Sequence, residues 1–426
     1  MTLALFTGTL LLIIAIGAPI AYALIVTGAA LMWQMGLFDG QIIAQNLLNA
    51  VDSFPMIAIP LFILAGEVMN AGGLSRRIIA LAQALVGHRR GGLGYVVIFA
   101  GVLLSSLSGS ALADAASLSA LLLPMMVAAG HSKERAGGLI ASASIIGPII
   151  PPSIGFIVFG VATNLSISKL FLAGIAPGII IALALAVAWY IVARSEDVTP
   201  QPRATWAECG RTFADSLWAL MLPIIIIVGL RFGIVTPTEA AGVAAAYSLC
   251  VAMFIYRELS FDDLIELVFR AGKTAAGVMF LVAAAAIPAW MITIADIPGQ
   301  VIALVEPLME HPKLLVFALM VLIIIVGTAM DLTPTILLLG PILVPVVDAA
   351  GVDPIYFGVL FMINCAIGLI TPPVGTVLNV VCAVGKMDYE TLVKGTLPFF
   401  LAEIIILFLL VLFPELVTVP ASWISH

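Results

Sequence analysis

The sequence predicts an all-α polytopic membrane protein, and three observations support this. Of its 426 residues, 63% are hydrophobic and 10% are charged, whereas soluble proteins carry about 25% charged residues. Apolar runs of about 20 residues, the length of a helix that crosses a bilayer, recur along the whole chain. The alternating pattern of a β-barrel is absent, and only helices and closed barrels satisfy their backbone groups in lipid.

Ten apolar stretches are expected to cross the membrane. They are 2–16, 19–37, 55–71, 136–161, 170–194, 214–232, 236–256, 274–295, 354–385 and 395–418. The first arginine is Arg76, so the basic segment of a cleavable signal peptide is missing and the first stretch is expected to be an uncleaved span.

The basic residues give the orientation. If the further apolar stretches 93–130 and 314–350 do not cross, 14 of the 17 lysines and arginines fall on one side, and only Lys169, Arg231 and Lys313 fall on the other. The positive-inside rule makes the first side cytoplasmic. Both termini are then predicted to be periplasmic, in a bacterial inner membrane.

The stretches 93–130 and 314–350 are predicted to be re-entrant hairpins. The first has basic residues at both ends and a polar interruption at 105–110, whereas the second has acidic flanks and is interrupted at 327–334. The two hairpins therefore enter from opposite faces. The amphipathic segments 73–88 and 297–312 are expected to lie along the two membrane surfaces.

An internal repeat links the two halves. Pro124 and Gly147 recur as Pro345 and Gly368, each 221 residues later, and the pair Pro151-Pro152 recurs at the same spacing as Pro372-Pro373. We expect a first repeat at 1–194, a cytoplasmic linker at 195–213 and a second repeat at 214–426, with interrupted helices at 136–161 and 354–385. An odd number of crossings inverts the second repeat, which is typical of ion-driven secondary transporters. Chance similarity between apolar segments is the alternative.

Each half places a polar hairpin tip beside a Pro-Pro break. Proline lacks a backbone donor, so carbonyls near Gly147 and Gly368 lose their helical partners, and oxygen ligands of this kind suit Na⁺. Helix N-termini at the breaks favour an anion between the tips. Hydroxyl ligands are expected from Ser105, Ser108, Ser110, Thr328, Thr333 and Thr371, for which helix packing is the alternative.

Acidic residues inside spans are functional candidates because a buried charge is costly in lipid. Asp114 and Asp331 follow the hairpin interruptions and are expected to cap the tips or tune ion binding. For Glu67, Glu239 and Glu403, the alternative is a protonated, paired or interfacial state without a functional role. The expected substrate-binding side chains are Ser110, Asp114, Ser153, Thr328, Asp331 and Asn364. His88 and His131 are expected to be solvated in cytoplasmic loops.

Five motifs, in order along the chain, resemble those of the large membrane subunit of TRAP (tripartite ATP-independent periplasmic) transporters. They are SLSGSALADAA (106–116), GPIIPPS (147–153), TPTEA (236–240), MDLTPT (330–335) and GLITPPVG (368–375). The resemblance implies an elevator-type symporter driven by Na⁺, with two or more ions, no organic cofactor and no ATP. The partners it implies are a separate small four-helix membrane subunit, a periplasmic binding protein and an organic acid substrate.

The resemblance also implies the ion ligands. The first Na⁺ site maps onto Ser105, Ser108, Gly147, Ile150 and Pro152, and the second onto Gly327, Gly368, Thr371 and Val374. Asp114 maps onto a hairpin acid that matters for transport.

Competing functions remain at this point. A channel or an intramembrane protease fits the motifs poorly, and nothing indicates an enzyme or a nucleic-acid partner. A stand-alone symporter of Na⁺ and divalent anions shares the predicted architecture. The substrate is open among sugar acids, sialic acids and dicarboxylates.

Overall fold

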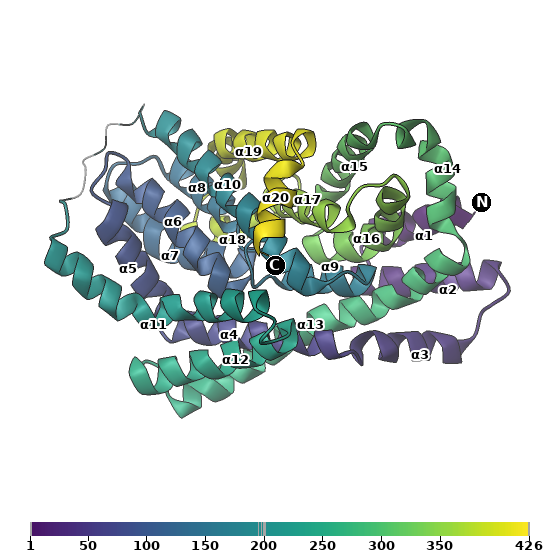
Figure 1. The fold of residues 1–426 in the computed structure, drawn as a ribbon, viewed down its shortest axis with the longest axis horizontal. Coiled ribbons are helices and arrows are strands. Elements are labelled where there is room, and N and C mark those ends of the chain that lie inside the picture. Colours follow the sequence, from purple (N-terminus) through teal and green to yellow (C-terminus); the bar gives the residue numbers. More distant parts are fainter. Residues whose placement is uncertain (1, 195, 197, 199–201, 425–426) are drawn as a thin grey trace.

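The computed structural model describes residues 2–194, 196, 198 and 202–424, and within these ranges the regular structure is helical throughout (Figure 1). The helices of the first half are α1 (Thr2–Ala15), α2 (Ile20–Gln34), α3 (Gly40–Val51), η1 (Phe54–Ile57), α4 (Ala58–Ala71), α5 (Leu74–Val86), α6 (Gly92–Ser108), α7 (Ala111–Ala128), α8 (Lys133–Ser144), α9 (Ile154–Thr163) and α10 (Ile167–Ala193). Those of the second half are α11 (Trp206–Arg231), α12 (Pro237–Cys250), η2 (Val251–Ile255), α13 (Phe261–Ile294), α14 (Ile297–Met309), α15 (Pro312–Gly327), α16 (Leu332–Ala349), α17 (Pro354–Gly368), α18 (Thr376–Gly385), α19 (Tyr389–Leu412) and α20 (Glu415–Ile424).

The all-α membrane class is confirmed. Eight helices in the described part of the chain are long and apolar enough to cross a bilayer. Six of the ten expected spans are among them, because α1 and α2 have only 14 and 15 residues and each interrupted helix is divided into two short pieces. The other two are one limb of each hairpin, α7 and α16. The direction in which the hairpins enter the membrane stays a prediction.

The repeat is visible in the order of the elements. The helices α7 and α16 begin 221 residues apart, as do α8 and α17. Contacts between the halves are reciprocal, because α7 packs against α18 while α16 packs against α9. Such exchange of equivalent contacts is what a two-fold relationship produces. Each hairpin is therefore held by the interrupted helix of the other repeat.

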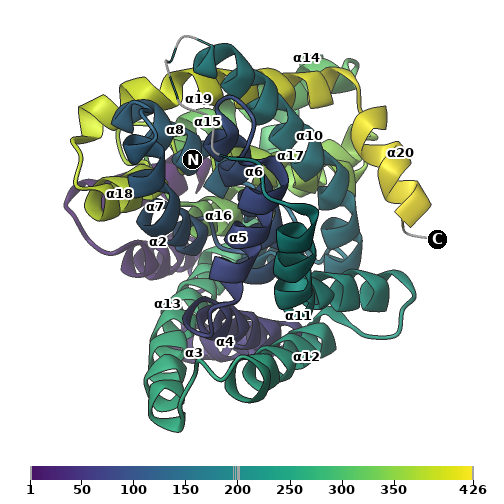
Figure 2. The same cartoon turned by 90° about the vertical axis from the view of Figure 1, so that its left-hand side faces the viewer.

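A second group of helices supports this core. In both views, α4, α11, α12 and α13 lie along the lower edge of the molecule (Figures 1 and 2). The helix α2 approaches α13 closely, since a Cβ at Gly28 would lie 2.9 Å from the backbone nitrogen of Pro288. The helix α5 is tied to this group by Arg77, which stacks 3.7 Å above the ring of Tyr256 and pairs with Glu258.

Several helix boundaries differ from the expectations. The helix α3 was not expected, although the sequence contains a signal for it: Asp39 caps this helix by accepting a hydrogen bond from the Gln41 N–H at 2.7 Å. The helix α11 already begins at Trp206, after a capping box of Thr205 and Glu208, so only 195–205 of the expected linker precedes it. Pro414 lies between α19 and the separate helix α20.

The expectation that His131 is a solvated loop residue is wrong. Its side chain is 2% exposed, and Nδ1 lies 2.6 Å from Oε2 of Glu196. The other carboxylate oxygen of Glu196 accepts a hydrogen bond from the Ser132 hydroxyl at 3.1 Å. These contacts fasten the beginning of the linker to the loop between α7 and α8, and sequence reasoning missed them because the partners are 65 residues apart. His88 is also partly buried.

We predict that Gly138→Ala destabilises the protein. A Cβ at Gly138 would lie 2.4 Å from the carbonyl carbon of Gly395, so α8 and α19 would have to separate, at a cost of about 1–3 kcal/mol. Thermal unfolding of the detergent-solubilised protein measures this. The control is Gly277→Ala, where a Cβ meets nothing within 4 Å. Equal melting temperatures for the two variants would contradict the prediction.

Candidate functional site

The tip of the first hairpin is organised around a serine and an aspartate. The Ser108 hydroxyl donates a hydrogen bond to Oδ1 of Asp114 at 2.6 Å. Ser110 caps α7, because its hydroxyl accepts a hydrogen bond from the Ala113 N–H at 3.4 Å. Gly109 lies between them with φ of +59°, a left-handed conformation that glycine adopts most readily. The tip therefore folds back over the first turn of α7.

This tip lies directly against the break between α8 and α9. A Cβ at Gly109 would be 2.1 Å from the carbonyl oxygen of Pro152, and a Cβ at Gly147 would be 2.8 Å from Oδ2 of Asp114. That carboxylate oxygen is buried without a hydrogen-bond partner in the described structure. A buried oxygen of this kind, next to interrupted backbone, suits a cation.

The break itself follows from the two prolines. Pro151 and Pro152 have no N–H to offer the carbonyls of Gly147 and Pro148, four residues earlier. Ser153 supplies one substitute, because its hydroxyl donates to the Pro148 carbonyl at 2.5 Å. The same hydroxyl oxygen accepts from the Phe156 N–H at 3.2 Å and so caps α9. One side chain thus closes one helix segment and begins the next.

The second tip and break repeat this arrangement with different groups. A Cβ at Gly368 would be 3.1 Å from the carbonyl oxygen of Gly327, so tip and break are again in contact. The carbonyl of Leu369, which is equivalent to that of Pro148, accepts a hydrogen bond from the Val377 N–H at 3.0 Å. Asp331, which is equivalent to Ser110, caps α16 and also accepts from the Thr376 hydroxyl at 3.3 Å.

Four helix N-termini meet in this region. Those of α7 and α9 are in contact, since a Cβ at Gly109 would be 3.2 Å from the Cα of Ser153. Those of α9 and α16 are in contact through Gly155 and Leu332, and those of α16 and α18 through Asp331 and Thr376. Helix N-termini carry positive partial charge, so their convergence favours an anion.

The structure brings only some of the expected residues to these contacts. Ser108, Asp114, Gly147, Pro152 and Ser153 lie together at the first break. Gly327 and Gly368 touch at the second. The hydroxyls of Ser105, Thr328 and Thr371 donate to backbone carbonyls three or four residues earlier in the chain. Such local bonds are also expected under the alternative, in which these residues serve helix packing.

Three further residues that were expected to bind ions or substrate are placed differently. The side chain of Ile150 packs against Gly178, and its N–H donates to the Ile146 carbonyl at 3.0 Å, so its carbonyl is the group left to face the site. Val374 is 38% exposed. Asn364 donates to the Met320 carbonyl at 2.7 Å, and its buried Oδ1 has no hydrogen-bond partner among the described residues.

Sequence reasoning missed two residues at the site, Gly109 and Thr376. The signal for Gly109 was its position between two serines at the tip, where a turn requires glycine. Thr376 had no readable signal, because its role depends on Asp331, 45 residues away.

The remaining intramembrane acids have different roles. Glu67 lies 3.7 Å from Arg270. Glu239 forms a capping box with Thr236. Glu67 is therefore a paired group and Glu239 a capping group, which agrees with the alternative that these acids have no transport role. Glu403 differs, because it is buried and its two carboxylate oxygens have no hydrogen-bond partner in the described structure.

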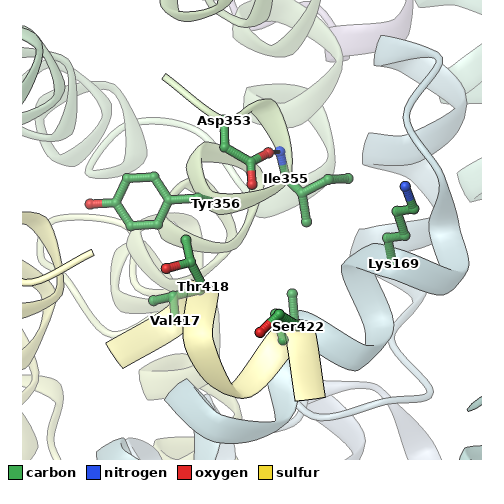
Figure 3. A pocket seen from close by; sticks show the side chains of 9 residues that line it. Lys169, Asp353, Ile355, Tyr356, Val417, Thr418 and Ser422 are labelled. Atoms are coloured by element: carbon green, nitrogen blue, oxygen red, sulfur yellow. Dashed lines mark hydrogen bonds between the residues drawn. The ribbon is translucent and has the colours of Figure 1, made fainter. Parts of the chain in front are cut away.

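A cavity of about 250 Å³ lies away from the tips, between α10, α17 and α20 (Figure 3). Lys169, Asp353 and Tyr356 are among its lining residues, and the Asp353 carboxylate is occupied by the Ile355 N–H at 2.8 Å. None of the residues predicted for ion or substrate binding lines it. We therefore place the candidate site at the tips and breaks.

We predict that Gly109→Ala destabilises the protein more than Gly233→Ala. Both glycines have positive φ, but a Cβ at Gly233 meets nothing within 4 Å, whereas one at Gly109 collides with the Pro152 carbonyl. The backbone strain is common to both, so the collision adds about 1–3 kcal/mol at Gly109 alone. Melting temperatures in detergent compare the two, and a larger loss in Gly233→Ala would refute the tip contact.

Comparison with known proteins finds relatives along the whole chain. Residues 7–416 match the family described as tripartite ATP-independent periplasmic transporter, DctM component. The 2,3-diketo-L-gulonate TRAP transporter large permease protein YiaN of Escherichia coli is 53% identical over 425 residues, covering 100% of both chains. The sialic acid TRAP transporter large permease protein SiaM of Vibrio cholerae is 36% identical over 94% of this chain and 93% of its own.

The fold is also similar to that of a solved structure, the YdaH transporter of Alcanivorax borkumensis. The TM-score is 0.63, and the match covers 91% of this chain and 90% of that one. Sequence identity is 17%, so this likeness concerns the fold alone.

Proposed function

This chain belongs to the DctM component family of tripartite ATP-independent periplasmic transporters, and from that premise we propose that it imports an organic acid across the bacterial inner membrane, driven by Na⁺. The observation that carries the proposal is the pairing of two hairpin tips with two proline-interrupted helices. Backbone interrupted in this way at membrane depth is found where it lines an ion or substrate path.

The first tip supports Na⁺ as the driving ion. Oδ2 of Asp114, which has no hydrogen-bond partner among the described residues, lies beside Gly147. The Gly147 carbonyl lacks a helical donor because residue 151 is a proline. An anionic oxygen and a free carbonyl are the ligands that a hard cation prefers. In the second half, the carbonyl of Gly327 lies against Gly368, and we assign the second ion to that contact.

The energy of such ions is sufficient without ATP. If two Na⁺ enter with one monoanion, a net charge of +1 moves, and about 2.3 kcal/mol is gained at 100 mV. A tenfold Na⁺ gradient adds about 1.4 kcal/mol per ion. The total of roughly 5 kcal/mol supports accumulation of several thousand-fold.

The substrate is proposed to be a carboxylate at the four converging helix N-termini. The relative with 53% identity is named for 2,3-diketo-L-gulonate, which favours a sugar acid. Sialic acid and C4-dicarboxylate relatives are less similar, at 36% and 35% identity.

We further propose an elevator mechanism with two partners. The hairpins and interrupted helices pack reciprocally and would move as one body past the helices α4, α11, α12 and α13. A separate small four-helix membrane subunit would brace that second group, and a periplasmic binding protein would deliver the substrate.

Reconstitution tests the proposal. Proteoliposomes containing this chain with its small subunit should accumulate a sugar acid only when an inward Na⁺ gradient and the binding protein are both present. Uptake that proceeds without a binding protein would support the alternative, a stand-alone Na⁺ and divalent-anion symporter. Uptake that needs ATP and ignores Na⁺ would refute both.

We predict that Asp114→Asn raises the Na⁺ concentration for half-maximal uptake by roughly tenfold or more. The substitution removes the charge next to Gly147, and an interaction with a charged group contributes about 1.5–3 kcal/mol. The control is Glu239→Gln, which changes an exposed capping acid. The assay is initial uptake rate against Na⁺ concentration, and an unchanged curve for Asp114→Asn would exclude this carboxylate from ion binding.

A further inference from the structure

Glu403 is a buried acid that the proposed mechanism does not use. It lies in the middle of α19, and its relative exposure is 0%. In the part of the chain that the structure describes, neither carboxylate oxygen has a hydrogen-bond partner. An ionised carboxylate in this position would be an uncompensated charge inside the membrane, which is costly.

The packing of α19 on α8 locates this side chain. A Cβ at Gly138 would collide with the Gly395 backbone, and a Cβ at Gly395 would collide with that of Glu134. The two helices begin at the same end, because Nζ of Lys133, the first residue of α8, donates to the Lys386 carbonyl at 3.0 Å, just before α19. Further along, Gly138 meets Thr396. Glu403 follows Thr396 by two turns, so it lies level with the end of α8, just before the break at Gly147.

A second unpartnered group lies on the facing surface. Ser142 follows Gly138 by four residues, which places it on the same side of α8, toward α19. It is 0% exposed, and its hydroxyl has no hydrogen-bond partner in the described ranges. On the other side, Phe399, one turn before Glu403, contacts the ring of Trp189 in α10 at 6.2 Å. The carboxyl therefore lies between α8 and α10.

No charged residue of the helices packed against α19 lies level with Glu403. Their charged residues are at or near helix ends: Lys133, Glu134 and Arg135 in α8, Lys169 in α10, Lys313 in α15 and Glu415 in α20, while α17 and α18 have none. The other titratable groups on these helices are Tyr190, Tyr356, Cys365 and Cys382. None of these supplies a positive charge to an ionised Glu403.

The repeat shows that the fold itself does not require this acid. The helices α10 and α19 correspond at the offset of 221, which also relates Pro177 to Pro398. At that offset, the equivalent of Glu403 is Ala182, which is buried in α10. A small apolar residue is therefore sufficient for packing at this position in the first repeat.

We propose that Glu403 is a proton-binding site: it is a neutral acid in this conformation and exchanges its proton during transport. The site lies level with the end of α8, just before the first break, so movement of that break would open it to water. A proton would then accompany Na⁺ in the cycle. The role in the cycle rests on the proposed function, whereas the protonated state does not.

The protonated state is tested without transport. Infrared spectra of the purified protein at neutral pH should contain a C=O stretching band of a buried carboxylic acid that is missing in Glu403→Gln. Glu390→Gln, an exposed acid on the same helix, is the control and should keep the band. If the spectrum of Glu403→Gln lacks no such band relative to the wild type, the proposal is overturned.

Stability gives an independent measurement. A carboxyl that is neutral in the folded protein and ionised in the unfolded chain takes up a proton on folding. The unfolding constant should then rise about tenfold per pH unit above the normal glutamate range near 4.3. Glu403→Gln should show a flatter pH dependence of melting than Glu390→Gln, and equal slopes would contradict the neutral state.

The exchange step is tested in proteoliposomes at a fixed Na⁺ gradient. Uptake by the wild type and by Glu390→Gln should fall as pH is raised, whereas uptake by Glu403→Gln should not depend on pH over the same range. An unchanged pH profile in Glu403→Gln would refute exchange. If no protein takes up substrate, the proposed function fails, while the infrared and melting results still decide the protonated state.

Discussion

The structure depends on the loss of backbone donors at two places inside the membrane. The pairs Pro151-Pro152 and Pro372-Pro373 leave helical carbonyls without partners in a region where lipid supplies none. Each break is met by the hairpin of its own repeat, at Gly109 against Pro152 and at Gly327 against Gly368. The halves are then joined by reciprocal packing, since α7 lies on α18 and α16 on α9. The same constraint that interrupts the helices thus brings polar groups and helix N-termini together.

The two halves satisfy this constraint with different chemistry. At the first break a side chain, Ser153, replaces the missing donor to Pro148. At the second break, the backbone N–H of Val377 donates a hydrogen bond to the equivalent carbonyl of Leu369. Ser110 and Asp331 occupy equivalent capping positions, but only the second carries a charge. A two-fold frame therefore holds two chemically unlike polar sites.

Much of the fold and part of the site could be predicted from the sequence. Helical class, hairpin limits and the repeat follow from hydropathy, prolines and glycines, which act locally. Helix ends were less predictable, because α3 is amphipathic and α20 is short. Among the candidate site residues, Ser108, Asp114 and Gly147 do lie together. The hydroxyls of Ser105 and Thr328 instead bond their own helices, and a residue type alone does not reveal that competition.

The sequence by itself determined that the chain is a duplicated helical membrane protein with two interrupted helices, because these features arise from residue composition and from the missing N–H of proline. Only the tertiary structure decided which groups meet. The buried pair of His131 and Glu196, the contact of Thr376 with Asp331, and the burial of the Glu403 carboxyl all depend on helix rotation and register. Those quantities are set by packing between segments far apart in the chain, which no local pattern encodes.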